Sequence, residues 1–123
     1  MLNVKDCLEK ANRNKNFALK ELAGLSQSYP DWVTVVAFYS ALHFVDAYLL
    51  AHHGIQREHH EEREREVAIH MRDIYVVYKE LYEMAFRSRY HALKDNPTPK
   101  DAENVLECDL PEVEEYVMGR MPS

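Results

Sequence analysis

The segment PDWVTVVAFYSALHFVDAYLLAHHG, residues 30–54, decides the fold of this 123-residue chain because it is the densest apolar stretch in the sequence. Pro30 suits the first turn of a helix, where its missing N–H would have no partner, and Ser28 with Asp31 resembles a capping box. Gly54 supplies the left-handed residue that ends a helix. Apolar residues occupy nearly every side of the segment in between. A helix of this kind is either the central helix of a bundle or a membrane span.

The polar residues within this segment favour the central helix over the membrane span. The length would fit a bilayer, but Thr34, Ser40, His43 and Asp46 interrupt the apolar run. An ionised Asp near the centre of a membrane helix costs roughly 2.5 to 3.5 kcal/mol. Residues 1–25 are rich in charged residues and lack the apolar core of a signal peptide. We therefore expect a cytoplasmic protein.

The composition predicts an all-α protein. The chain holds 3 glycines and 5 prolines, and 46% of its residues are hydrophobic, which fits helices better than sheets. Amphipathic spacing predicts one helix over residues 4–25, capped by Asn3, and another over residues 73–95. Thr98 and Pro99 then predict a short helix ending at Cys108, and Pro111 begins a second one. We expect a single domain, residues 1–123, folded as a four- to five-helix up-down bundle with short C-terminal helices.

The net charge of −6 comes from one end of the chain. Residues 101–115 hold seven acids and no lysine or arginine, whereas residues 1–100 hold fourteen acids and fourteen bases. Broad, sequence-independent binding of nucleic acid depends on a basic face that neutralises phosphates. That class of protein is therefore disfavoured, but a small basic site on a neutral body is compatible with the sequence.

Several classes of enzyme are disfavoured by spacing. The sequence contains no glycine-rich phosphate loop, nucleophile elbow or zinc-finger pattern. Seven histidines suggest metal binding, but the Glu-x-x-His pattern of ferritin-like bundles is absent. A metal-binding bundle that uses His59, His60 and neighbouring glutamates is a third alternative, and our main prediction includes neither a metal nor a cofactor. The two cysteines, Cys7 and Cys108, are expected to be buried free thiols.

One group of side chains suits a phosphodiester. His60 and Arg63 share a helical stripe with Val67 and Met71, and a later helix carries a cationic C-terminal end. We predict Arg87 and His91 as catalytic residues, because they lie four apart on one helical face. We predict His60, Arg63, Arg89 and Tyr90 as substrate-binding residues. Arginines bind phosphate oxygens through paired hydrogen bonds, and a histidine can transfer protons near neutral pH. RNA supplies its own 2′-hydroxyl nucleophile, so this chemistry needs no metal.

The order of these landmarks resembles the HEPN superfamily of small helical domains. The resemblance spans residues 32–91 and rests on WVTVVAFYSALHFVDAYLL, a following glycine, REHHEER and YKELYEMAFRSRYH. It implies a helical bundle that dimerises with its polar clefts facing each other. It also implies a metal-independent endoribonuclease of toxin, defence or RNA-processing type, often paired with a nucleotidyltransferase antitoxin. Other members of the superfamily are noncatalytic.

The sequence departs from the catalytic pattern of that superfamily. Catalytic members carry Arg, four to six residues, then His, whereas three residues separate Arg87 from His91. Arg63 and Arg65 each satisfy the count with His70, but they lie one helix earlier than the resemblance implies. The alternative is a noncatalytic dimeric interaction module, in which the arginines form internal salt bridges to Asp46 or to the acidic segment 101–115.

Overall fold

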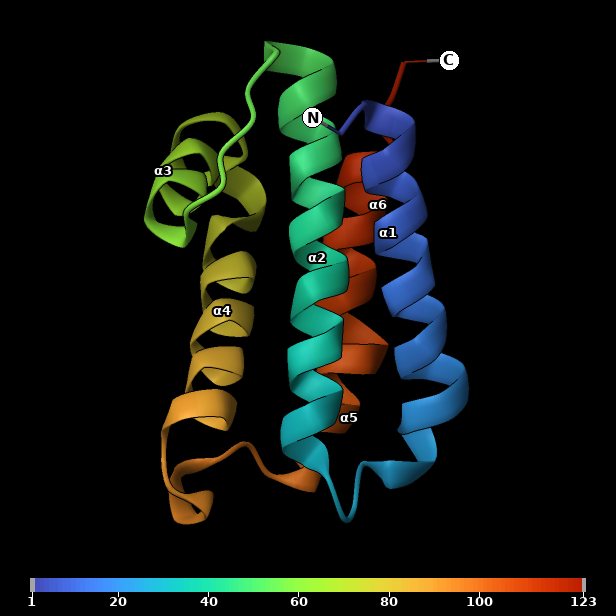
Figure 1. Cartoon of the computed structure of the whole chain (residues 1–123), viewed down its shortest axis with the longest axis vertical. Coiled ribbons are helices and arrows are strands. Elements are labelled where there is room, and N and C mark those ends of the chain that lie inside the picture. The colour runs from blue at the N-terminus through green and yellow to red at the C-terminus, as the bar shows by residue number, and fades with distance from the viewer. Residues whose placement is uncertain (1, 123) are drawn as a thin grey trace.

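The computed structural model describes residues 2–122, and all regular secondary structure in that range is helical (Figure 1). The α-helices are α1 (Val4–Asn16), α2 (Pro30–His53), α3 (His60–His70), α4 (Tyr75–Tyr90), α5 (Pro99–Asn104) and α6 (Leu110–Met118). Two π-helical turns, Phe17–Leu22 and Val105–Asp109, continue α1 and join α5 to α6. Short 3₁₀ turns at Ala23–Leu25, Arg72–Ile74 and Leu93–Asp95 complete the connections. The predicted all-α bundle is confirmed.

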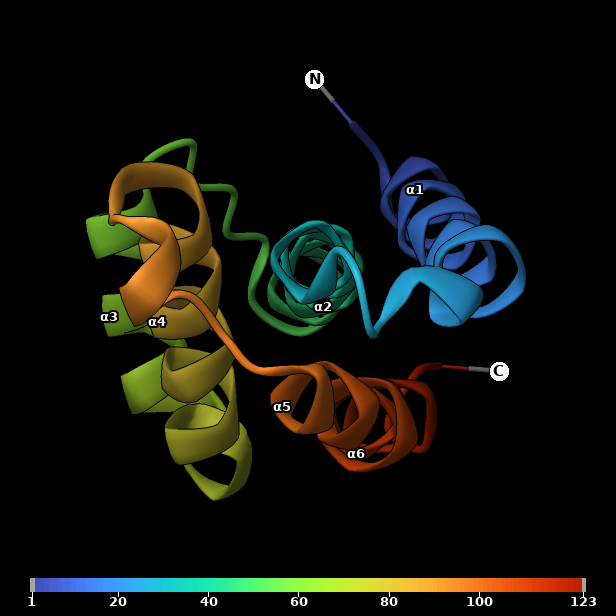
Figure 2. The same ribbon diagram turned by 90° about the horizontal axis from the view of Figure 1, so that it is seen from below.

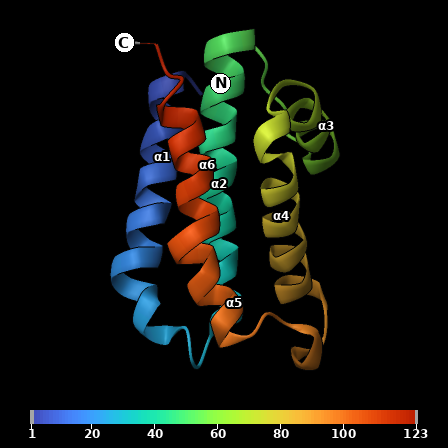
Figure 3. The same cartoon turned by 180° about the vertical axis from the view of Figure 1, so that it is seen from behind.

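Helix α2 is the centre of the bundle. Seen along its axis, it lies between α1, α4 and the rod formed by α5 and α6 (Figure 2). From behind, that rod covers α2, while α3 lies beside the first turns of α4 (Figure 3). The opposite side of α2, which faces the viewer in Figure 1, is flanked by α1 and α4 without a covering helix. The bundle is therefore closed on one side of α2 and more open on the other.

The packing of α2 accounts for its apolar sequence. Five of its side chains are fully buried, and they belong to one core with residues from every other α-helix: Val33, Ala37, Phe38, Ala41 and Phe44. By length and composition α2 could also cross a membrane, but 67% of its most apolar window is buried inside the bundle. Burial in the core is thus a sufficient reason for the apolar character of this helix.

The ends of the helices follow local capping rules at most positions. Asn3 and Asp6 form a reciprocal capping box at the start of α1, and Thr98 and Asp101 form one at α5. Gly54 ends α2 with a φ of 64°, a left-handed conformation that glycine adopts without strain. The prediction of a Ser28 cap for α2 is wrong. Tyr29 occupies the N-cap position, and within the described residues its side chain makes no capping bond.

The C-terminal helices form one rod rather than two separate helices. A proline inside a helix lacks the N–H for the bond to the fourth residue back and crowds that carbonyl. The π turn widens the helix before Pro111 and the amide of Leu110 bonds Val105 five residues back, so the rod continues. Cys7 is buried as predicted, but Cys108 is exposed on this rod.

Candidate functional site

Arg63 is the most buried of the predicted site residues. It lies in α3 with 5% of its surface exposed, on the same inward stripe as Val67 and Met71, which are fully buried. Its Nε donates to Asp46 Oδ1 over 2.7 Å, and its Nη2 donates to Asp46 Oδ2 at 3.3 Å and to the Arg57 carbonyl at 2.7 Å. This arrangement binds α3 and the preceding loop to α2.

The ion pair between Arg63 and Asp46 acts mainly on the fold. Burial raises the pKa of the Asp46 carboxyl, and the hydrogen bond and charge of Arg63 oppose that rise. Desolvation of a buried ion pair is costly, and good geometry with further hydrogen bonds offsets the cost. The third bond, to the Arg57 carbonyl, supplies such support. The structure therefore assigns Arg63 to an internal pair and leaves it out of the exposed group of cations.

His60 begins α3 and is half-buried between α2 and α4. Its ring lies 5.1 Å from the ring of Tyr82 and 5.8 Å from that of Phe38, measured between centroids. Burial lowers its pKa, and the positive charges of Arg63 and Arg89 lower it further. Its Nδ1 is buried without a partner among the described residues. His60 is therefore a neutral ring that packs against an aromatic side chain of α4.

Arg87 and His91 meet at the C-terminal end of α4. Together with Tyr82, Glu83 and Phe86 they line a shallow pocket of about 350 Å³. The His91 ring stands edge-on to the Phe86 ring, with centroids 5.8 Å apart and an interplanar angle of 84°. The pocket contains the cation and the imidazole that the sequence predicts as catalytic, and Phe86 forms part of its apolar wall.

Arg89 and Tyr90 belong to the same end of α4 but have different surroundings. Arg89 donates from Nη1 to the Tyr39 hydroxyl over 2.7 Å, and its guanidinium lies over the Tyr39 and Tyr90 rings at 5.6 and 5.1 Å. The Tyr90 ring is 65% exposed and the Phe86 ring 40%, with 4.8 Å between their centroids. Two exposed rings therefore lie beside two arginines and a histidine.

Carboxylates surround the other side of Arg87. It lines a second pocket, of about 250 Å³, with Glu80, Glu83, Asp101 and Asp109. Burial and the charges of Glu80 and Glu112 raise the pKa of the Asp109 carboxyl. Among residues 2–122, however, Arg87 has no ion pair within 4.0 Å. The acidic segment therefore lies near Arg87 without a direct salt bridge to it.

The sequence reasoning did not include His43 of α2 among the candidate site residues. His43 lines two cavities. One lies against α1 and has a volume of about 660 Å³, and the other contains Asp46 and Arg63 and has a volume of about 830 Å³. The sequence feature that could have indicated the cavity against α1 lies in the first helix, where Lys10, Arg13 and Phe17 follow one another at intervals of three and four residues.

The third alternative, a metal-binding bundle, finds no support in the geometry. Across the described part of the chain, no group of three or more His, Cys, Asp or Glu side chains is arranged to hold a metal ion. His59 and His60 lie at the start of α3, where His59 is exposed and His60 packs against aromatic rings.

Comparison of the chain with family models, with curated proteins and with solved structures finds no match.

Proposed function

We propose that this chain is a cytoplasmic HEPN-like domain protein that binds single-stranded RNA or a nucleotide at the C-terminal end of α4. The surface in question, which we call the α4 surface, consists of Phe86, Arg87, Arg89, Tyr90 and His91. The observation that carries the proposal is the exposure of the Phe86 and Tyr90 rings, 40% and 65%, directly beside the cationic side chains.

The chemistry of the α4 surface matches the two parts of a nucleotide. Bases stack on exposed aromatic rings, and each such contact contributes about 1 to 3 kcal/mol to binding. Guanidinium groups bind phosphate oxygens through paired, charge-assisted hydrogen bonds. Single-stranded RNA suits this surface better than a duplex because its bases are free to stack. A local group of cations on a chain with a net charge of −6 favours a short contact of a few nucleotides.

The same proposal includes a way to cleave the RNA. The 2′-hydroxyl of the bound nucleotide attacks the neighbouring phosphorus, and the 5′-oxygen of the next nucleotide leaves, which yields a cyclic phosphate. Arg87 binds the non-bridging oxygens, and the imidazole of His91 takes the proton from the 2′-hydroxyl and gives it to the leaving 5′-oxygen. Both residues line one pocket, and no metal takes part in this step.

Binding is tested with a fluorescently labelled single-stranded RNA and measurement of its anisotropy. Each of the variants Phe86→Ala and Tyr90→Ala should raise the Kd roughly tenfold through the loss of one stacking contact. Val76→Ala is the matched control, because Val76 is an apolar residue on the same helix with 64% exposure and lies outside this surface. Equal affinity for all variants would refute the proposed binding surface.

Cleavage is tested separately by incubation of the protein with structured RNA in EDTA. Arg87→Ala and His91→Ala should each abolish most of the activity, whereas the wild-type protein should produce cyclic phosphate ends. Undiminished cleavage by both variants would remove the catalytic assignment. Binding without any cleavage by the wild-type protein would leave an RNA-binding domain without nuclease activity.

A second candidate is a noncatalytic, homodimeric interaction module. At one end of the bundle α2 and α4 are in contact, with Thr34 Oγ1 3.0 Å from Ser88 Oγ. The large apolar side chains exposed at this end favour such a module. These side chains are Tyr29, Trp32, Phe86, Tyr90 and Leu93. Analytical ultracentrifugation of the wild-type protein and of Trp32→Ser tests it, since loss of this ring should weaken a dimer that uses this end. If the protein cleaves RNA as proposed above, we propose a nucleotidyltransferase antitoxin as its partner.

A further inference from the structure

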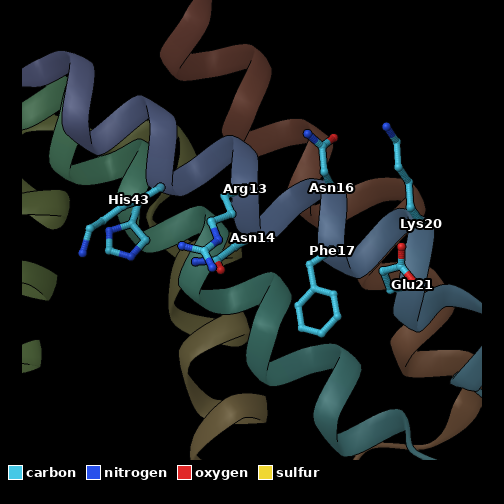
Figure 4. A pocket seen from close by; sticks show the side chains of 8 residues that line it. Arg13, Asn14, Asn16, Phe17, Lys20, Glu21 and His43 are labelled. Atoms are coloured by element: carbon cyan, nitrogen blue, oxygen red, sulfur yellow. The ribbon is translucent and has the colours of Figure 1, made fainter.

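The cavity between α1 and α2 is a second candidate binding site, remote in sequence from the α4 surface. It has a volume of about 660 Å³, within the range of small-molecule sites in proteins. One side is formed by α1 and the π turn that continues it, through Lys10, Arg13, Asn14 and Phe17, whose spacing of three and four residues places them on one face of a helix. His43 of α2 forms the opposite wall (Figure 4).

The charge of this cavity is positive although the chain is acidic. Lys10, Arg13 and Lys20 line it with one carboxylate, Glu21, so three positive charges and one negative charge leave a net charge of about +2. In residues 2–122 none of these three cations forms an ion pair. Lys15 of the same helix, by contrast, binds Glu114 over 2.7 Å. The cations that face the cavity thus have no partner of the kind that neutralises Lys15.

His43 contributes a polar group without adding charge. Its pKa is lowered to about 4, mainly by burial and further by the charges of Lys10 and Arg63, so that the ring is neutral at neutral pH. A neutral imidazole carries one N–H donor and one acceptor nitrogen. Nδ1 of His43 is buried and has no hydrogen-bond partner in the described range. In Figure 4 the His43 ring and Arg13 lie toward one end of the cavity and the Phe17 ring toward the other.

We propose that this cavity binds a nucleoside monophosphate, with the phosphate at Lys10 and Arg13 and the base against Phe17. Arg and Lys are the side chains that bind phosphate most often, and Arg does so through two parallel hydrogen bonds. The Phe17 ring is 46% exposed and offers a face on which a base stacks. The side-chain amide of Asn14 carries both a donor and an acceptor for a base edge or a ribose.

The ligand class is tested by isothermal titration calorimetry with three probes: adenosine monophosphate, inorganic phosphate and adenosine. The monophosphate should bind with a Kd at least tenfold lower than either fragment, since it alone reaches both ends of the cavity. Equal Kd values for the monophosphate and inorganic phosphate would overturn the role of Phe17. Absence of binding of the monophosphate up to millimolar concentrations would overturn the site.

The location is tested with variants of α1. Arg13→Gln should raise the Kd for adenosine monophosphate roughly tenfold, the usual loss for a charge-assisted hydrogen bond, and Lys10→Gln provides a second, independent test. Lys5→Gln is the matched control, because it removes the same charge from an exposed position of α1 outside the cavity. An unchanged Kd for both cavity variants, or an equal loss in the control, would refute the assignment.

This inference does not rest on the proposed RNA-binding function. Arg13→Gln should leave the affinity of the α4 surface for single-stranded RNA unchanged, and Phe86→Ala should leave the affinity of the cavity for adenosine monophosphate unchanged. Failure of one proposal is therefore distinguishable from failure of the other, because the variants of the cavity and those of the α4 surface are each measured with both ligands.

Discussion

Arg63 of α3 and Arg87 of α4 belong to helices that both lie beside α2, yet their guanidinium groups have opposite surroundings. Arg63 is 5% exposed and bound to Asp46 and a carbonyl. Arg87 lines two open pockets and has no ion pair in the described residues. The difference comes from the facing helix. α2 offers a carboxylate in direct contact with Arg63, whereas the carboxylates that line a pocket with Arg87 form no ion pair with it among residues 2–122.

This contrast separates a role in the fold from a role in binding. A guanidinium held by three hydrogen bonds is fixed, and its removal leaves a buried carboxylate without a partner. A guanidinium at an open pocket is free to bind an anion, and its removal has little effect on the packed core. The two arginines should therefore respond oppositely to the same substitution.

The largest effect is expected from Arg63→Met. The buried Asp46 would lose its partner, and the free energy of unfolding should fall by about 3 to 5 kcal/mol. The same change at Arg87 should alter it by less than about 0.5 kcal/mol, as is usual for surface positions. Urea denaturation followed by circular dichroism measures both values. Equal losses at the two positions would contradict the contrast between them.

The double variant Asp46→Leu with Arg63→Leu serves as the control for that result. It removes both charges, so no unpaired group remains buried, and much of the stability lost in the single variant should return. A double variant as unstable as Arg63→Met would point to lost packing rather than to an unpaired charge.

A smaller effect is expected from the titration of His43, which lies between Lys10 and Arg63. Its pKa is about 4 in the folded protein and 6.5 as the ordinary value. The unfolded chain therefore binds the proton first, and stability falls as the pH falls from about 6.5 toward 4. Allowing for the partial exposure of the ring, we expect a contribution of about 2 kcal/mol.

Urea denaturation of the wild-type protein and of His43→Gln at several pH values isolates this contribution from that of other groups. The difference in the free energy of unfolding between the two proteins should change across this pH range and stay constant above pH 7. A difference that is independent of pH would show that His43 is not the titrating group.

A still smaller loss than that at His43 is expected from Tyr39→Phe. The variant removes the hydroxyl that accepts from Arg89 Nη1 but keeps the ring beneath the guanidinium. One hydrogen bond to a charged group contributes about 1.5 to 3 kcal/mol, and partial exposure of this pair favours the lower value. Thermal unfolding measures the change. A loss as large as that of Arg63→Met would place Arg89 among the buried structural arginines.

Much of the fold was predictable because it depends on local rules. The apolar run of residues 30–54 predicted the central helix, and Gly54 predicted its end through the left-handed conformation that glycine favours. Asn3 and Thr98 were predicted as N-caps, and each forms a capping box. The continuation of the helix through Pro111 was not predictable in this way, because the π turn that accommodates the proline depends on packing of the rod against α2 and α4.

The candidate site was predictable in residue type but not in exposure. The spacing of His60, Arg63, Val67 and Met71 predicted one stripe of a helix, and Val67 and Met71 are buried; Arg63, which was predicted to bind substrate, is buried with them. The alternative interpretation named Asp46 as a salt-bridge partner of the arginines, and Arg63 does bind it. The sequence could not show which arginine reaches Asp46, since that contact depends on how two helices face each other. The cavity at His43 was missed for the same reason, because its walls come from α1 and α2.

The most direct test of the account is the salt dependence of single-stranded RNA binding by the wild-type protein, Arg87→Gln and Lys79→Gln. Lys79 is an exposed cation of α4 outside the α4 surface, so its removal controls for net charge. Arg87→Gln should raise the Kd roughly tenfold and lower the slope of log Kd against log salt by about 0.7, the value for one phosphate contact in a single strand. Lys79→Gln should leave both unchanged. Equal slopes for wild type and Arg87→Gln, or no binding by the wild-type protein, would contradict the account.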